Sequence, residues 1–193
     1  MICILISSLL AQVGAVPVPV QMDQTANIAY SLKEIRADGS EPALFLPHFK
    51  QNHPLVLFFF SEQCGVTFSY KDRIQQLLKD FEPVGFKFLG IRGGKRENAD
   101  APLKIGETNY LKMTFVDDAT GDMVKQFRVG QSLTFAVLDS AGILRYLGGF
   151  DDRVSAAQVK RPYLRKALRQ IATGKPVTTK SGATLGCSII PIQ

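Results

Sequence analysis

The sequence has few of the side chains that bind metals, with only two histidines and three cysteines in 193 residues. The candidate ligands are His48, His53, Cys64 and Cys187, and each histidine stands beside a proline. Zinc and copper sites need several nitrogen or sulfur ligands at suitable spacing, which these four positions do not offer. We therefore expect both histidines to be loop residues, and we expect no metal and no other cofactor.

Long hydrophobic runs are also absent after residue 15. The longest core-like run, Leu55–Phe60, has strand length, whereas a membrane span needs roughly 20 apolar residues. Residues 1–15 are apolar and uncharged and end in Val13-Gly-Ala15, which is typical of a signal peptide without its usual basic start. The alternative is an N-terminal membrane anchor. We expect export to the periplasm or the extracellular space, and no stable membrane insertion after cleavage.

Acidic residues are missing from the C-terminal part of the chain. From Arg153 onward there are eight Lys and Arg residues and no Asp or Glu, in a chain of net charge +6. Nucleic-acid binding is one interpretation of this basic end. However, the basic residues surround Leu164, Ala167, Leu168 and Ile171 at helical spacing. We therefore expect the solvated face of an amphipathic helix, and no nucleic-acid partner.

The composition, with 46% hydrophobic and 21% charged residues, fits one globular domain. Apolar strands are expected at Ile28–Ile35, Leu55–Phe60, Phe86–Ile91, Lys112–Val116, Thr134–Leu138 and Ile143–Leu147, with a turn at 37–40. Helices are expected at 65–81, 101–110, 122–127 and 161–174. Strands and helices therefore alternate in a β-α-β-α-β-β-α order, which predicts an α/β fold with a central sheet.

The expected organisation has four parts. Residues 1–15 form the signal peptide and residues 16–26 a proline-containing linker. Residues 27–174 form the α/β domain, and residues 175–193 form a tail that carries Cys187.

Cys64 is the most informative residue, because it follows a buried strand and opens a helix. The free N–H groups and the dipole of a helix start favour a thiolate, which is the reactive form of cysteine. Cleavage after Ala15 would remove Cys3 and leave Cys64 and Cys187 as an even pair that can form a disulfide. Closing so long a loop would contribute roughly 4–5 kcal/mol, so a purely structural bridge is an alternative to a catalytic one.

The order of elements and the position of Cys64 resemble the thioredoxin fold, a central mixed sheet flanked by helices. More narrowly, the chain resembles secreted redoxin-type proteins of the thioredoxin/peroxiredoxin superfamily. The stretches that carry the resemblance are FFFSEQCGVTFSY at 58–70, FAVLDSAG at 135–142, YLGGFDD at 146–152 and a C-terminal Gly186-Cys-x-Ile189 element. The resemblance implies a thiol–disulfide oxidoreductase or antioxidant redoxin.

In thioredoxins the nucleophilic cysteine begins a Cys-x-x-Cys pair, whereas here Thr67 holds the second position. Its hydroxyl could donate a hydrogen bond to the Cys64 thiolate but cannot form a disulfide. The alternative is that it bonds a nearby backbone carbonyl. Cys187 is then the only candidate resolving cysteine, so residues 180–190 should fold back and bring the two Cα atoms to roughly 4.4–6.8 Å.

Two other features of the superfamily are altered. Leu133 stands where thioredoxins have a cis-proline, and a cis bond there would cost roughly 2.5–4 kcal/mol, so we expect trans. Peroxiredoxins carry Pro-x-x-x-(Thr/Ser)-x-x-Cys and an arginine. Ser61 fits the hydroxyl position, but Leu57 replaces the proline and the arginine position falls at Leu133.

The sequence therefore predicts an exported thiol–disulfide oxidoreductase that acts on a protein or small-molecule thiol or disulfide. Cys64 would be the nucleophile, Thr67 would stabilise its thiolate and Cys187 would resolve the intermediate. The alternative is a non-catalytic binding or scaffold domain with a structural Cys64–Cys187 disulfide. A peroxiredoxin-like thiol peroxidase ranks third.

Overall fold

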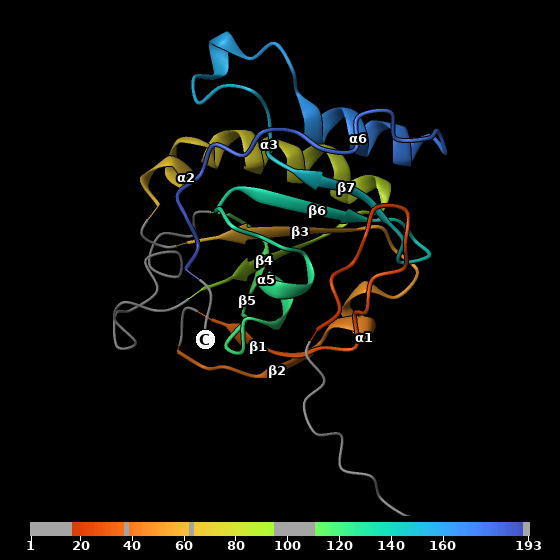
Figure 1. The fold of residues 1–193 in the computed structure, drawn as a ribbon, viewed down its shortest axis with the longest axis vertical. Coiled ribbons are helices and arrows are strands. Elements are labelled where there is room, and N and C mark those ends of the chain that lie inside the picture. The colour runs from red at the N-terminus through yellow and green to blue at the C-terminus, as the bar shows by residue number, and fades with distance from the viewer. Residues whose placement is uncertain (1–16, 37–38, 62–63, 95–110, 191–193) are drawn as a thin grey trace, which may run out of the picture.

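A seven-stranded mixed sheet forms the centre of the computed structural model, which describes residues 17–36, 39–61, 64–94 and 111–190 (Figure 1). The strand order is β2-β1-β5-β4-β3-β6-β7. The strands are β1 (Ser31–Ile35), β2 (Ala43–Phe45), β3 (Leu55–Phe60), β4 (Lys87–Arg92), β5 (Thr114–Asp117), β6 (Thr134–Leu138) and β7 (Leu144–Gly148). Strands β3, β4 and β5 are parallel, and the remaining pairings are antiparallel.

Helices cover both faces of the sheet. They are α1 (Leu46–Lys50), α2 (Gly65–Ser69), α3 (Lys71–Phe81), α5 (Asp122–Gln126) and α6 (Tyr163–Ala172), with short 3₁₀ turns at Glu82–Val84 and Ala156–Gln158. Side chains of α3 and α6 pack in one apolar cluster, and those of α1 and α5 pack in the other. In Figure 1, α3 and α6 accordingly lie together on one side of the strands.

Strand β3 explains why the sheet has two cores. All six of its side chains are buried. Val56, Phe58 and Phe60 belong to the cluster under α3 and α6, and their neighbours in β3 belong to the cluster under α5. Successive side chains of a strand point to opposite faces, so this uninterrupted apolar run is the pattern of a strand covered on both sides. The predicted α/β fold with a central mixed sheet is confirmed.

The helix expected at 65–81 is interrupted at Tyr70, which separates α2 from α3. Tyr70 is buried, and its hydroxyl donates to Asp151 (3.0 Å) and to the carbonyl of Arg153 (2.9 Å). Burial and the Asp151 charge raise the pKa of Tyr70 to about 12. Arg73 also donates to Asp151 (2.6 Å), so this cluster joins the start of α3 to the segment after β7. Such a long-range contact leaves no periodic signal in the sequence.

Two short elements, β2 and α1, were not expected, because three- and five-residue elements give almost no periodicity. The turn at 37–38 and the helix expected at 101–110 lie outside the described residues. Residues 17–26, expected as a linker, pack against the domain. The amides of Val20, Asp23 and Ala26 donate to the carbonyls of Gln126, Leu144 and Gly142.

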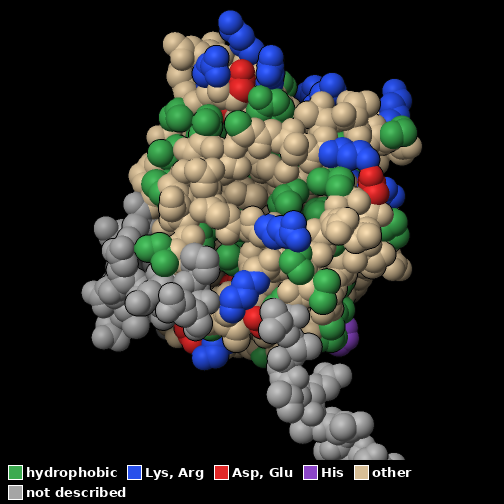
Figure 2. All heavy atoms as spheres, in the orientation of Figure 1, with side chains coloured by type: hydrophobic (Ala, Val, Ile, Leu, Met, Phe, Trp, Pro, Cys, Tyr) green, Lys and Arg blue, Asp and Glu red, His purple; other side chains and the backbone are tan. Residues whose placement is uncertain are grey.

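The C-terminal basic segment folds as an amphipathic helix. In α6, Leu164, Ala167 and Leu168 are buried, while Lys166 and Arg169 are exposed. Figure 2 shows further basic side chains at the top of the molecule, where Figure 1 places the segment that precedes α6. Within the described ranges, no helix is both long and apolar enough to cross a bilayer.

Candidate functional site

Cys64 lies just beyond the carboxyl end of β3, and its carbonyl accepts the amide of Thr67 (3.0 Å) at the start of α2. The extended backbone of Cys64 (φ −82°, ψ 101°) makes it the residue that caps this helix, as the sequence predicts. Its exposed fraction is 0%, so the sulfur lies within the protein. The strand-to-helix junction therefore holds Cys64 in a fixed, enclosed position.

The C-terminal tail returns to this junction along the outer edge of the sheet (Figure 1). The amides of Leu147 and Gly149 donate to the carbonyls of Lys180 (2.9 Å) and Gly182 (3.1 Å), which attaches the tail to the edge strand β7. Further along, the amide of Ile189 donates to the carbonyl of Gly130 (3.0 Å). The tail is thus attached to the domain by its main chain both before and after Cys187.

Two glycines allow the tail to approach this closely. A Cβ atom on Gly149 would lie 2.0 Å from the carbonyl oxygen of Ala183, and one on Gly186 would lie 1.9 Å from that of Ser132. Both distances are far inside van der Waals contact, and the opposing atoms belong to the backbone. Only glycine fits these positions without a shift of the chain.

The structure joins Cys64 and Cys187 by a disulfide with a Cα–Cα distance of 5.6 Å, which lies within the ordinary range. The prediction that the tail folds back and brings Cys187 to Cys64 is confirmed. The amide of Cys187 lies 3.2 Å from the Cys64 sulfur and 3.1 Å from the Ser132 hydroxyl, and it donates to both. The amide of Ser132 in turn donates to the Cys187 carbonyl (2.8 Å).

The two cysteines of this bridge differ in their access to solvent. Cys64 is fully buried, whereas Cys187 is exposed. Ser132, which is hydrogen-bonded to both the amide and the carbonyl of Cys187, is also fully buried. Ser132 is a residue that the structure brings to this site and that the sequence did not single out as a candidate. Its only signal was its place directly before Leu133.

Thr67 lies in the first turn of α2, as expected for a residue three positions after the cysteine. Its hydroxyl oxygen is buried and has no hydrogen-bond partner among the residues that the structure describes. In this oxidised state the Thr67 hydroxyl therefore bonds neither the Cys64 sulfur nor a backbone carbonyl of the described residues. The Cys64 sulfur is bonded to Cys187 and accepts that residue's amide instead. A buried polar group without a partner costs roughly 1–3 kcal/mol.

Leu133 occupies the place of the superfamily's cis-proline with a trans bond, as expected, since the described residues contain no cis peptide. Its φ of 60° lies in the left-handed region, which costs a residue with a Cβ roughly 1–2 kcal/mol. Its side chain is buried in the core under α3 and α6. Leu57, at the place of the peroxiredoxin proline, is buried on the opposite face, and Ser61 is half-buried.

Both histidines lie away from the disulfide. His53 lies two residues before β3, at the end opposite Cys64, and its Nδ1 is 3.0 Å from the carbonyl oxygen of Gly85. His48 belongs to α1 and packs edge-on against Phe45. Across the described part of the chain, no three His, Cys, Asp or Glu side chains are grouped as metal ligands would be.

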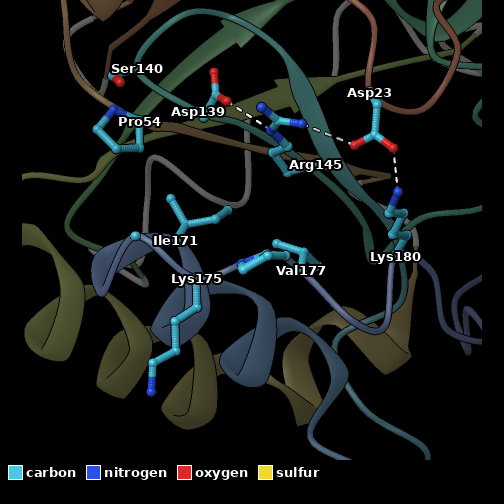
Figure 3. Close-up of a pocket in the computed structure, with 11 residues that line it drawn as sticks. Asp23, Pro54, Asp139, Ser140, Arg145, Ile171, Lys175, Val177 and Lys180 are labelled. Carbon is cyan, nitrogen blue, oxygen red and sulfur yellow. Dashed lines mark hydrogen bonds and ion pairs between the residues drawn. The ribbon is translucent and has the colours of Figure 1, made fainter.

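A hollow of about 620 Å³ lies near Pro54, at the start of β3 (Figure 3). Arg145 donates there to Asp139 (2.8 Å) and to Asp23 (3.1 Å), and Lys180 also contacts Asp23. The Lys180 contact, and secondly Arg145, hold the pKa of Asp23 below its usual range. Arg145 and Lys180 are thus paired with the carboxylates of Asp139 and Asp23. We therefore interpret these ion pairs as contacts that attach the tail to the N-terminal segment.

Comparison with solved structures shows a thioredoxin-like fold. A hypothetical protein from Sinorhizobium meliloti 1021 matches with a TM-score of 0.72 and 21% identity, over 90% of this chain and 96% of that one. The reduced 2-Cys peroxiredoxin of Plasmodium vivax matches with a TM-score of 0.57 and 18% identity, over 80% and 83%. An uncharacterised thioredoxin-like protein from Porphyromonas gingivalis gives 0.57 and 18%, over 80% and 95%.

No curated protein matches the chain. Residues 30–147, more than half of the sequence, match the AhpC/TSA family. With the fold and the paired cysteines described above, this match assigns the chain: it belongs to the AhpC/TSA family of thioredoxin-like proteins.

Proposed function

We propose that this protein is an exported thiol–disulfide oxidoreductase. The observation that carries the proposal is the bridge between Cys64 and Cys187, with the tail seated so that the second sulfur meets the first. Disulfides persist mainly in oxidising compartments, which agrees with the signal-like residues 1–15.

The reaction on a substrate disulfide has two steps. Once both cysteines are reduced, a local shift of the tail around Cys187 uncovers Cys64. The Cys64 thiolate then attacks one substrate sulfur, the substrate S–S bond breaks, and the other substrate sulfur leaves as a thiolate. The Cys187 thiolate then attacks the Cys64 sulfur, which forms the internal disulfide and releases the second substrate thiol. The substrate is reduced by two electrons, and the cysteine pair is oxidised by two.

Two groups beside Cys64 support this role. The Cys187 amide lies 3.2 Å from the Cys64 sulfur, and a donor at this place stabilises a thiolate more than a neutral thiol. The buried Thr67 hydroxyl has no partner in the described residues of the oxidised form. A Cys64 thiolate would give this hydroxyl an acceptor after reduction. Thr67 is therefore our candidate for the side chain that stabilises the thiolate.

The reduction potential of the mature chain, measured in glutathione or dithiothreitol buffers, tests the proposal. We expect a value above about −300 mV, because structural disulfides of secreted proteins lie below it. Cys64→Ser should abolish disulfide reductase activity, whereas Cys187→Ser should accumulate mixed disulfides on Cys64. Thr67→Val should raise the alkylation pKa of Cys64, and Thr67→Ser serves as the matched control. Hydrogen peroxide is tested in parallel as an alternative oxidised substrate.

A scaffold or binding domain is the second candidate, and the complete burial of Cys64 beneath a docked tail favours it. In that case the potential falls below about −300 mV and neither cysteine substitution changes any redox assay. Each substitution should then act mainly on stability, with a loss of roughly 4–5 kcal/mol from opening the loop.

A further inference from the structure

We infer that the disulfide is opened from its Cys187 side: a reducing thiol attacks the Cys187 sulfur, and Cys64 leaves as the thiolate. The physiological meaning of this direction rests on the proposed oxidoreductase function. The direction itself follows from the geometry of the bridge, in which one sulfur belongs to an exposed residue and the other to a buried one.

Access to the two sulfurs is unequal. The attacking thiolate approaches the attacked sulfur from the side opposite the leaving sulfur, in line with the S–S bond. Behind Cys64 lies the protein interior, because this residue has an exposed fraction of 0%. Cys187 is exposed, and its amide and its carbonyl are both bonded to Ser132. Solvent therefore reaches the bridge at the Cys187 residue and not at Cys64.

The hydrogen bonding favours the same direction. A sulfur that is stabilised as a thiolate is the better leaving group in thiol–disulfide exchange. The Cys187 amide donates to the Cys64 sulfur, and no hydrogen-bond donor to the Cys187 sulfur is found among the described residues. Attack on the Cys187 sulfur therefore releases Cys64, whose sulfur already accepts a hydrogen bond from the Cys187 amide.

The contacts of the tail preserve this arrangement after the S–S bond breaks. Ser132 holds the amide and the carbonyl of Cys187, and Gly130 accepts the amide of Ile189. The Ile189 side chain, 5% exposed, belongs to the core under α5. None of these contacts involves a sulfur atom. Ser132 thus acts as a positioning residue that keeps the Cys187 amide against the Cys64 thiolate while the adduct is carried at the surface.

The complete step balances with thiol as the only reductant. The first thiolate, RS⁻, bonds to the Cys187 sulfur and the Cys64–Cys187 bond breaks, which leaves a Cys64 thiolate and a Cys187–S–S–R adduct. A second thiolate attacks the sulfur of R, and Cys187 leaves as a thiolate. Two thiols become one disulfide, and both cysteines are reduced.

The experiment identifies which cysteine carries the first adduct. The oxidised mature chain is treated with glutathione in the presence of iodoacetamide, which caps the released cysteine and prevents reclosure. Trypsin places Cys64 in the peptide 51–71 and Cys187 in the peptide 181–193, so mass spectrometry reads each site separately. We expect glutathione on Cys187 and carbamidomethyl on Cys64 in about tenfold or greater excess over the reverse.

The same chain, unfolded in urea with its disulfide intact, is the control, because both sulfurs are then accessible and the two adducts should form in similar amounts. A native ratio equal to the unfolded ratio, or an excess of adduct on Cys64, overturns the inference. The ratio is obtained whether or not the bridge is catalytic. A potential below about −300 mV would remove the proposed function and leave the direction of opening intact.

Discussion

The contact between Gly186 and Ser132 gives a quantitative test of how the tail is docked. In Gly186→Ala the new Cβ would lie 1.9 Å from the carbonyl oxygen and 2.4 Å from the carbonyl carbon of Ser132. These are backbone atoms, so no side-chain rotation relieves the overlap, and the tail must move away from Ser132. The disulfide holds the strained tail against Ser132, whereas the reduced variant can relieve the strain by releasing its tail. Gly186→Ala therefore makes the disulfide form less stable relative to the reduced chain.

The expected magnitude follows from the cost of overpacking, roughly 1–3 kcal/mol. At 1.4 kcal/mol for each factor of ten, the equilibrium constant for closing the disulfide should fall by about 5- to 150-fold. A two-electron couple shifts by roughly 30 mV for each factor of ten, so the potential should become about 20–65 mV less negative.

The assay is equilibration in glutathione buffers, followed by alkylation and mass spectrometry of the two cysteine peptides. Gly130→Ala is the matched control, because a Cβ there meets nothing within 4 Å, although Gly130 itself accepts the Ile189 amide. The control should stay within about 10 mV of the wild type, a twofold change in the constant. An equally small shift in Gly186→Ala would refute the close approach of the tail to Ser132.

Three further predictions concern stability, measured by urea unfolding. Leu133→Pro should lower the free energy of unfolding by roughly 3 kcal/mol, because proline requires φ near −65° and Leu133 has φ 60°. A variant as stable as the wild type would contradict the left-handed conformation of residue 133. Asp151→Asn should lower the free energy of unfolding by about 3 kcal/mol, because it leaves the largely buried Arg73 charge without its carboxylate partner. An unchanged urea midpoint would argue against this ion pair. Burial raises the pKa of Asp118, so wild-type stability should fall as pH rises from about 4 through the raised pKa. Asp118→Asn should lose that decline. Asp122→Asn should keep most of it, because burial raises the pKa of Asp118 more than the Asp122 charge does. The opposite pH trend would show that the shift has the wrong sign.

The sheet could be predicted because its central strands are buried on both faces. In β3 each of six successive residues is apolar, and the sequence needs no long-range information to specify such a strand. Helix α6 was predictable for a related reason, since Leu164 and Leu168 repeat at helical spacing between exposed basic residues. The pairing of Cys64 with Cys187 followed from the resemblance and the lack of another cysteine after residue 15.

The details of the site could not be predicted, because main-chain contacts determine them. The pairing of residues 180–182 with β7 uses amides and carbonyls, which every residue type possesses. The burial of Ser132 and the left-handed backbone of Leu133 depend on how the tail crosses the loop before β6. For the same reason, the unequal exposure of Cys64 and Cys187 has no signature in their spacing.

The attachment of the tail bears on whether the bridge serves catalysis or only stability. A purely structural disulfide is most useful where little else holds a segment. Here the tail is already bonded to β7 through Lys180 and Gly182 and to the loop before β6 through Ile189. If these contacts persist in the reduced chain, the Cys187 sulfur remains close to Cys64 and the bond reforms with little loss of chain entropy. The disulfide can then open and close without unfolding of the tail. A redox cycle needs this property, whereas a purely structural disulfide does not.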